Sequence, residues 1–356
     1  MTDHHTPISA IGEFGLIDRI RKTIDTSRLG KTSEHHLIRG IGDDAAVYRP
    51  QPGKIELITT DALIEGIHFD LTFTSLRHLG WKSMIASFSD IAAMCGTPRY
   101  ATVTIAVPQK ITVEMIDEFY AGAAFAGSEY KCLIVGGDTT ASPGNMMISV
   151  TVIGEAIEER VRYRSGAKPG NLLCVTGHLG ASLAGLKILQ REKSRFQASA
   201  DQSAFLPNLE PYAAAIEKHF LPKPRLDISK LFEEHVAVTA VIDVSDGLAS
   251  EAHHLCRASK CGAQIYEHNL PVIGTTQKIA AEFGDQASTY ALYGGEEYEL
   301  LFTIDDKEYE KLENLTGDVS VIGRITGTPE EVELIEEGGT SRQLQSNGWD
   351  HFTERG

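Results

Sequence analysis

Aspartates at the ends of apolar, strand-like segments are the side chains of this 356-residue chain most able to do chemistry. Asp61 follows IELITT, Asp138 follows LIVGG, and Asp243 and Asp246 lie in AVIDVSDGL. Such charges are costly to bury unless they are paired, and carboxylate oxygens are the ligands that Mg²⁺ prefers. The pattern favours a magnesium site built from distant segments, although each aspartate alone also fits a turn or a helix N-cap.

Further oxygen donors and glycines accompany these aspartates. The additional donors are Asp44, Asp90, Thr59, Thr60 and Ser245. Glycine lets a backbone approach a phosphate closely and offer its N–H groups. The segment Gly177–Gly180 fits either an anion cradle at a helix N-terminus or tight strand–helix packing. The chain therefore has the parts of a phosphate-binding, metal-assisted enzyme.

The composition limits the possible partners. Lys and Arg number 33 against 49 Asp and Glu, a formal charge of −16, which disfavours nucleic acid as a partner. Phosphate binding would then need a divalent cation to neutralise both partners. The five cysteines form no CxxC pair, as expected of reduced thiols in a cytoplasmic protein. No signal peptide is recognisable, and no apolar run approaches the roughly 20 residues that span a bilayer.

Well-known catalytic signatures are missing from the sequence. We find no GxxxxGK[ST], GxGxxG, GxSxG or HExxH motif and no protein-kinase set. His68 lies just past Asp61, where it would meet an anionic substrate. The basic segment RYRSGAKPG, residues 162–170, fits phosphate contacts or an exposed turn between domains.

The elements that position these residues form two helix–strand alternating stretches, which predict a two-domain α/β (α+β) chain. We expect residues 1–37 to be an extension and lead-in, 38–160 the first domain and 161–356 the second. The first stretch predicts strands at Lys54–Thr60, Ala101–Val107, Cys132–Val135 and Met147–Ile153. The polar segment 191–208 is expected to be a loop or mobile insertion.

Several stretches in a fixed order resemble one family. They are GEFGLI (12–17), GIGDDAAV (40–47), TTDALIEGIHF (59–69), SDIAAMCGTP (89–98), GGDTT (136–140), RSGAKPG (164–170), IDVSDGL (242–248), GGEEYEL (294–300) and GWDHF (348–352). The chain resembles the thiamine-monophosphate kinase family, within the aminoimidazole-ribonucleotide-synthetase-like superfamily. The resemblance spans about residues 12 to 352 and implies a PurM-like architecture of mixed sheets with flanking helices.

The resemblance implies a reaction and a set of partners. The family transfers the γ-phosphoryl group of ATP to thiamine monophosphate, with several Mg²⁺ ions, and gives thiamine diphosphate. Its first domain carries most metal and ATP contacts and pairs with its twin in a homodimer, and its second domain closes the site. No nucleic acid and no membrane are implied.

The resemblance also assigns residues. The implied metal ligands are Asp44, Thr59, Thr60, Asp61, Asp90, Asp138, Asp243 and Asp246. The implied ATP contacts are Tyr120, Gly137, Asp138, Arg164 and Ser245. The implied contacts to thiamine monophosphate are His68, Glu296 and Trp349.

No side chain is expected to act as a general base. A phosphate monoester has a second pKa near 6, so the acceptor is largely dianionic at neutral pH. Direct in-line transfer by positioning and electrostatic stabilisation is then sufficient.

Two alternatives remain. One is another ATP- and Mg²⁺-dependent enzyme of the superfamily: aminoimidazole ribonucleotide synthetase, selenophosphate synthetase or a hydrogenase-maturation dehydratase. The first cysteine, Cys95, lies in a helix-like stretch and the C-terminus is HFTERG, which disfavours the two cysteine-dependent enzymes. The other alternative is an inactive module that binds nucleotide or thiamine phosphate.

Overall fold

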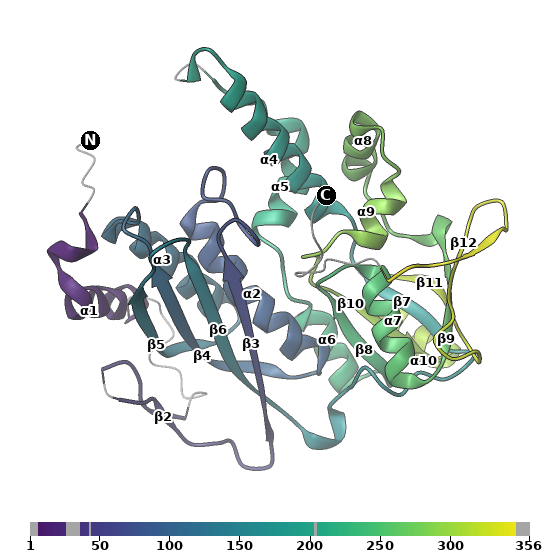
Figure 1. Cartoon of the computed structure of the whole chain (residues 1–356). Coiled ribbons are helices and arrows are strands. Elements are labelled where there is room, and N and C mark those ends of the chain that lie inside the picture. Colours follow the sequence, from purple (N-terminus) through teal and green to yellow (C-terminus); the bar gives the residue numbers. More distant parts are fainter. Residues whose placement is uncertain (1–5, 26–35, 43, 203–204, 347–356) are drawn as a thin grey trace. The chain divides into compact units, whose positions relative to one another are not determined.

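The structure, a computed structural model, describes residues 6–25, 36–42, 44–202 and 205–346. It divides into two compact units (Figure 1). Unit 1 comprises Met1–Ile91 and Gly96–Glu159, and unit 2 comprises Ala92–Cys95 and Arg160–Gly356. Helices and mixed sheets occur in both, which confirms the predicted fold class.

Unit 1 is built on a four-stranded sheet of order β3-β6-β4-β5, in which only the β4–β5 pair is parallel. Its strands are β3 (Ile55–Ile64), β4 (Thr97–Val107), β5 (Leu133–Ala141) and β6 (Met147–Ala156). A separate ribbon pairs β1 (Leu37–Arg39) with β2 (Val47–Tyr48). The helices are α1 (Gly12–Asp25), α2 (Leu76–Ala93) and α3 (Val113–Glu129).

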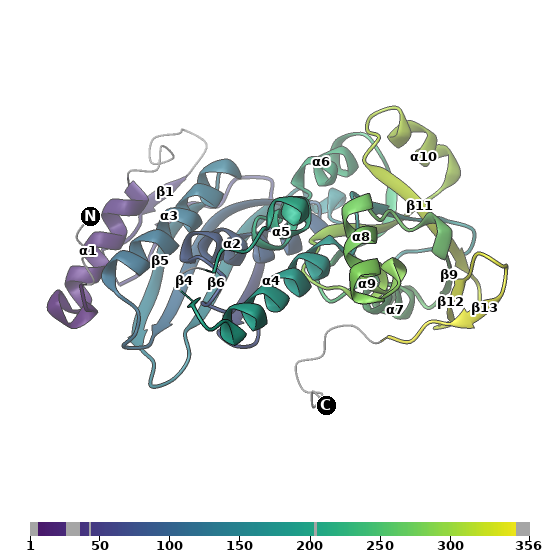
Figure 2. The ribbon, with the colours of Figure 1, turned by 90° about the horizontal axis from the view of Figure 1, so that it is seen from above.

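The helices of unit 1 lie on one face of this sheet (Figures 1 and 2). Helices α2 and α3 pack so closely that a Cβ at Gly80 would lie 1.9 Å from the Phe119 carbonyl oxygen. On the helix-covered face of β3, Leu63 is buried and Thr59 and Asp61 are half-buried, whereas the alternating Thr60 and Ala62 are exposed. This alternation is the period of a strand with one covered face.

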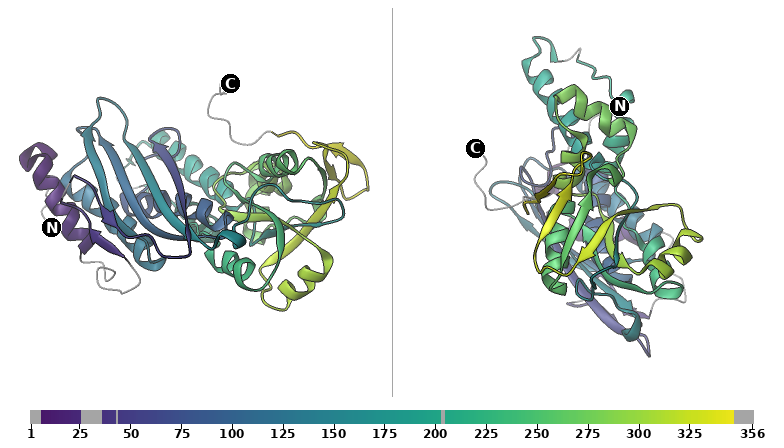
Figure 3. Two further views of the ribbon diagram at one scale, coloured as in Figure 1. Left: turned by 90° about the horizontal axis from the view of Figure 1, so that it is seen from below. Right: turned by 90° about the vertical axis from the view of Figure 1, so that its right-hand side faces the viewer.

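Unit 2 is built on a seven-stranded sheet of order β13-β12-β9-β11-β7-β10-β8, with β12 and β13 at one edge (Figure 3). Its strands are β7 (Leu172–Thr176), β8 (Val238–Val244), β9 (Gly262–Tyr266), β10 (Glu299–Ile304), β11 (Val319–Thr326), β12 (Val332–Ile335) and β13 (Ser341–Gln343). Its helices are α4 (Ala181–Ala198), α5 (Ala213–Phe220), α6 (Leu226–Glu234), α7 (Leu248–Ser259), α8 (Gly274–Phe283), α9 (Ala287–Tyr293) and α10 (Asp306–Glu313).

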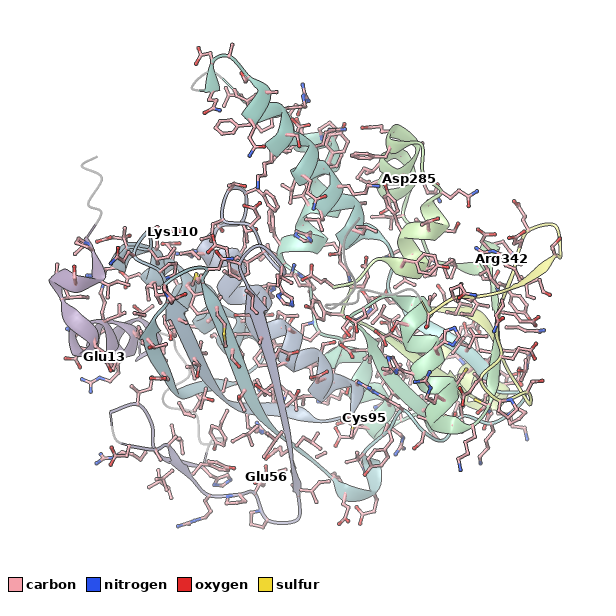
Figure 4. The ribbon with its side chains drawn as sticks, in the orientation of Figure 1. Glu13, Glu56, Cys95, Lys110, Asp285 and Arg342 are labelled. Atoms are coloured by element: carbon pink, nitrogen blue, oxygen red, sulfur yellow. The ribbon has the colours of Figure 1, made fainter. Side chains whose placement is uncertain are left out.

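Apolar clusters hold the helices of unit 2 in place. Leu248 and Leu255 of α7 share one cluster with Val175 of β7. Phe232 of α6 packs in another cluster with Phe302 of β10, their ring centroids 4.7 Å apart. A third cluster joins α4, α5, α8 and α9. At its edge Asp285, labelled in Figure 4, accepts a hydrogen bond of 2.5 Å from Lys187 of α4.

One prediction about this unit was wrong. Residues 191–198, expected to belong to a loop, continue α4 to Ala198. The polar residues there stabilise the helix: Glu192 is 6% exposed and receives hydrogen bonds from Arg191 and Arg195. The Glu192–Arg195 pair, at i,i+3, supports a helix, and Arg, Glu and Lys have high helix propensity.

Within the described residues, no helix combines the length and apolar character needed to cross a membrane. The five cysteines are buried free thiols.

Candidate active site

Three of the predicted metal ligands come together on the helix-covered side of unit 1. Thr59 Oγ1 of β3 donates a hydrogen bond to Asp90 Oδ2 of α2. Two residues along β3, Asp61 Oδ2 accepts a 2.6 Å hydrogen bond from Ser87 Oγ, one helical turn before Asp90. The strand period and the helix period thus bring two carboxylates to one place.

The charge of this pair is unfavourable. Burial of the Asp61 carboxylate and the nearby negative charge of Asp90 raise the pKa of Asp61 to about 6, against the lowering effect of the Ser87 hydrogen bond. A divalent cation between the two carboxylates would remove the repulsion and lower this pKa. The donor set of two carboxylates and a threonine hydroxyl consists only of hard oxygens and fits Mg²⁺.

Thr60 lies on the other side of the same strand. Its Oγ1 lies 3.0 Å from Thr151 Oγ1 and 3.4 Å from Ser149 Oγ, both on β6. Ser149 pairs in register with Thr104, which pairs with Asp138 of β5. The predicted ligands of unit 1 therefore line two faces of the sheet, Thr59 and Asp61 on one and Thr60 and Asp138 on the other.

The GGD segment, Gly136–Asp138, lies within β5 and has a backbone at Gly137 that only glycine fits. A Cβ at Gly137, where φ is +156°, would lie 2.0 Å from the Val103 carbonyl oxygen. The next residue, Asp138, is exposed, and its Oδ1 accepts the Thr139 N–H at 2.9 Å. An exposed carboxylate beside a side-chain-free backbone suits both a metal and a phosphate.

His68 lies in a tightly held loop after β3. Its Nδ1 accepts the Ile64 N–H at 3.0 Å, which assigns the ring proton of the neutral form to Nε2. Glu65 anchors the loop: its carboxylate accepts hydrogen bonds from Lys110 (labelled in Figure 4) and from the Met146 N–H. His68 can thus offer an Nε2–H donor to an anionic group.

A second group of predicted residues meets in unit 2. Asp243 lies near the end of β8 and is 3% exposed. Ser245 and Asp246 follow, and Glu251 of α7 holds this turn by accepting the Asp246 N–H at 2.9 Å and the Ser245 hydroxyl at 3.5 Å. Burial, with the Asp246 charge, raises the pKa of Glu251 to about 7.

Glu296 and Arg164 adjoin this turn. The Glu296 N–H donates to the Ser245 carbonyl oxygen at 2.7 Å, and Glu296 adopts φ of +60°. Arg164 is exposed, and its positive charge acts to lower the pKa of both Glu251 and His254. Unit 2 thus brings a predicted substrate contact next to predicted metal and ATP contacts.

The alternatives left open for Gly177–Gly180 are decided in favour of packing. Glu297 Oε1 accepts the Ser182 N–H at 3.0 Å, so a carboxylate of the protein already lies at the N-terminus of α4. A Cβ at Gly177 would lie 2.5 Å from Glu299 Oε1, and one at Gly180 would lie 2.9 Å from the Ala291 nitrogen. The glycines admit neighbouring protein groups at this helix end.

The remaining predicted residues are placed as follows. Asp44 is exposed in the bend between β1 and β2. Tyr120 of α3 is 3% exposed, and burial raises the pKa of its hydroxyl. Trp349 lies outside the described residues.

The metal set as a whole is divided between the units. Asp44, Thr59, Thr60, Asp61, Asp90 and Asp138 belong to unit 1, and Asp243 and Asp246 to unit 2. Within the described part of the chain, no group of three or more His, Cys, Asp or Glu side chains is close enough to hold a metal ion.

Glu251 is a site residue that the sequence analysis missed. A signal for it exists: Glu251 shares the apolar helical face of Leu248, Ala252 and Leu255 at i−3, i+1 and i+4, where an unpaired carboxylate would be costly. A charge at such a position indicates a specific polar partner.

Two family models match the chain. The model described as AIR synthase related protein, N-terminal domain, matches residues 42–156, and the corresponding C-terminal-domain model matches residues 168–335. Apart from Ala92–Cys95, which belong to unit 2, the first match lies in unit 1, and the second lies in unit 2.

Individual relatives match most of the chain. The thiamine-monophosphate kinase of Bacillus subtilis is 33% identical over 88% of this chain and 93% of its own length. The crystal structure of thiamine-monophosphate kinase from Stenotrophomonas maltophilia superposes with a TM-score of 0.76 at 28% identity, covering 92% of this chain and 97% of the other. A structure of AaThiL complexed with AMPPCP and TMP has a TM-score of 0.72 at 30% identity, covering 98% and 100%.

Proposed function

The chain belongs to the thiamine-monophosphate kinase family, and from that premise we propose how its residues transfer a phosphoryl group from ATP to thiamine monophosphate. The reaction is a phosphotransfer that gives thiamine diphosphate and ADP. The observation that carries the proposed metal dependence is the Asp61–Asp90 pair, in which burial and then the charge of Asp90 raise the pKa of Asp61 to about 6.

Mg²⁺ is the proposed metal, in several ions. Its proposed ligands are Asp44, Thr59, Thr60, Asp61, Asp90, Asp138, Asp243 and Asp246. When bound, the ions neutralise the charge of the two anionic substrates and polarise phosphoryl oxygens. The aspartates keep this charge in a fixed place, which explains how a chain with a net charge of −16 can act on phosphates.

The proposed ATP contacts come from both units. The backbone at Gly137 and Asp138, the guanidinium of Arg164 and the hydroxyl of Ser245 would hold phosphate and ribose oxygens. Tyr120 is a further proposed ATP contact, with a side chain that is 3% exposed.

The thiamine monophosphate contacts have distinct chemistries. His68 offers an Nε2–H donor that suits the phosphate of the substrate. The Glu296 carboxylate suits the cationic thiazolium or the aminopyrimidine, and the Trp349 ring suits stacking on a cationic heteroaromatic ring.

No protein base is needed for the transfer. The acceptor phosphate, with a second pKa near 6, is already a nucleophile at neutral pH. We therefore propose direct in-line transfer with no phosphorylated side chain, in which the residues position and neutralise the two substrates.

A homodimer is the proposed assembly. Within the described residues of unit 1, no helix covers the face of the sheet that carries Thr60, and on this face Ile58 is 72% exposed. An exposed isoleucine on an open sheet face suits a second copy of the same face. The native chain should then sediment as a dimer and an Ile58→Lys variant as a monomer. The buried free thiols fit the cytoplasm, the proposed compartment.

A ³¹P NMR time course tests the reaction. The protein is mixed with ATP, thiamine monophosphate and Mg²⁺, with and without EDTA. We expect thiamine diphosphate and ADP to appear and EDTA to abolish both. ADP and free phosphate without thiamine diphosphate would indicate a different acceptor, and no ATP consumption would indicate a binding module.

A further inference from the structure

His219 is a buried residue of unit 2 that faces Glu296. It lies in α5, is 4% exposed, and its Nδ1 is 3.7 Å from Glu296 Oε2. The same Nδ1 is 3.2 Å from Ser182 Oγ in the first turn of α4. Two helices thus bring one imidazole nitrogen to the carboxylate that we assign to thiamine monophosphate.

The two oxygens around Nδ1 assign its proton. A carboxylate can only accept, so a lone pair on Nδ1 would face the Glu296 charge and repel it. A proton on Nδ1 instead faces both Glu296 Oε2 and Ser182 Oγ, and both can accept it. The neutral ring with its proton on Nδ1 is therefore the form that holds Glu296.

This arrangement is not a hydrolase triad. In such a triad the imidazole uses its two nitrogens, one toward the serine and one toward the acid. Here Ser182 and Glu296 both face Nδ1, and Ser182 is 1% exposed. The geometry orients a carboxylate and provides no nucleophile.

The surrounding contacts make the position of His219 rigid. A Cβ at Gly185 of α4 would lie 2.3 Å from the Ala215 carbonyl oxygen of α5, so the two helices pack with almost no space between them. Lys218, the preceding residue, donates a hydrogen bond to Glu299, and Glu297 accepts the Ser182 N–H. The three glutamates of GGEEYEL are each contacted by the α4–α5 pair.

We propose that His219 is a positioning residue for thiamine monophosphate: its Nδ1–H, supported by Ser182, orients the Glu296 carboxylate that recognises the thiamine moiety. The inference rests on the proposed role of Glu296. It does not involve ATP, so loss of this contact should change the KM for thiamine monophosphate and leave the KM for ATP and kcat within about twofold.

Two amide substitutions test the role of Nδ1. In His219→Asn the side-chain amide nitrogen can take the place of Nδ1, whereas in His219→Gln it takes the place of Nε2. We expect H219Q to raise the KM for thiamine monophosphate about fivefold, because it removes the N–H that faces the Glu296 charge at 3.7 Å. H219N should restore the KM to within about threefold of the native value.

The controls separate positioning from folding and from the proposed function. His235, exposed after α6, serves as matched control, and H235Q should leave both KM values unchanged. Equal KM values for H219N and H219Q would overturn the inference, whether both rise or neither changes. If H219Q does not fold, Ser182→Ala, which removes the other partner of Nδ1, should raise the same KM, and an unchanged value would overturn the proposal.

Glu296→Gln separates the role of His219 from the role of Glu296 in binding thiamine monophosphate. A raised KM for thiamine monophosphate in E296Q with a normal KM in H219Q would refute the role of His219 alone. A normal KM in E296Q would refute the assignment of Glu296 and the inference with it, while leaving the phosphotransfer reaction itself intact.

Discussion

Each unit buries a pair of carboxylates, and the two pairs are held in different ways. In unit 1, Asp61 and Asp90 receive hydrogen bonds from the neutral hydroxyls of Ser87 and Thr59. In unit 2, Glu299 receives hydrogen bonds from Lys218, Arg225 and Thr176, and Glu297 lies 4.0 Å from the Lys218 ammonium. Glu299 thus has its counter-charges built into the fold, as a structural network requires, whereas burial raises the pKa of Glu297.

The difference suggests that the partners of a carboxylate indicate whether its role is structural or chemical. Glu299, which meets arginine and lysine, belongs to the structural packing, whereas Asp61, whose pKa is raised by burial and by the charge of Asp90, is a candidate for the chemistry. The comparison predicts that Asp61 controls activity with little effect on stability, and that Arg225 controls stability.

The largest effect is expected from Asp61→Asn. The change keeps the shape and removes the charge, so kcat/KM should fall about 100- to 1,000-fold, the loss expected with a metal's charge stabilisation. The thermal midpoint should stay the same or rise, because the repulsion with Asp90 disappears. The matched control is Glu118→Gln on the exposed surface of α3, which should keep full activity. Near-normal turnover of D61N at ordinary Mg²⁺ would refute the metal role.

Arg225→Met should have the largest effect on stability. Arg225 is 6% exposed and donates to Glu299 Oε2 and to Asp318 Oδ2, each at 2.7 Å. Its removal leaves Glu299 buried with one counter-charge fewer, so urea denaturation should show a loss of about 3–5 kcal/mol. Arg257→Met, on an exposed helix surface, is the control and should change stability by less than about 0.5 kcal/mol. A loss below about 1 kcal/mol in R225M would contradict the structural reading of this network.

The raised pKa of Glu297 should make the free energy of unfolding depend on pH. Burial raises its pKa from 4.5 to about 7, so between these values the folded state binds a proton that the unfolded chain has released. The free energy of unfolding should therefore fall as pH rises from about 4.5 to 7, by on the order of 3 kcal/mol. Glu297→Gln should lack this part of the slope when both proteins are unfolded in urea at pH 5 and pH 8. Parallel pH profiles for the two proteins would show that Glu297 is ionised when buried.

The smallest effect is expected from Arg77→Ala. Arg77 donates to Glu118 at 2.8 Å, and both side chains are more than half exposed. Exposed ion pairs contribute little, so the loss should be about 0.5 kcal/mol or less in urea and should shrink further in high salt. If R77A lost as much free energy of unfolding as R225M, burial would not explain why buried and exposed ion pairs differ in their contribution to stability.

The predicted site residues lie in local motifs, but the expected strand ends were wrong for Asp61 and Asp138, which lie inside β3 and β5. Asp61 and Asp243 do lie in strands, and their neighbouring hydroxyls were identified from spacing and resemblance. The strand period also implies that Thr60 and Asp61 point to opposite faces, but it does not say which face the helices cover. That depends on packing between segments far apart in the chain.

The residues that were missed depend on tertiary contacts. His219 lies in an eight-residue helix, too short for a clear hydrophobic period, and its partners Ser182 and Glu296 are 37 and 77 positions away. The polar residues after Gln190, among them Glu192, suggested a loop. In the structure the Glu192 carboxylate is buried and accepts hydrogen bonds from Arg191 and Arg195, and α4 continues to Ala198. Composition alone does not distinguish a solvated charge from a paired one.

The backbone at Gly137 also limits which amino acids can replace the residue at this position. Because any side chain there would lie 2.0 Å from the Val103 carbonyl oxygen, a saturation library should retain glycine alone at this codon. Gly144, in the turn before β6, has open space around its Cα and should accept many residues. Directed evolution of the proposed metal site must therefore vary Asp138 and its neighbours on β4 while Gly137 is held constant.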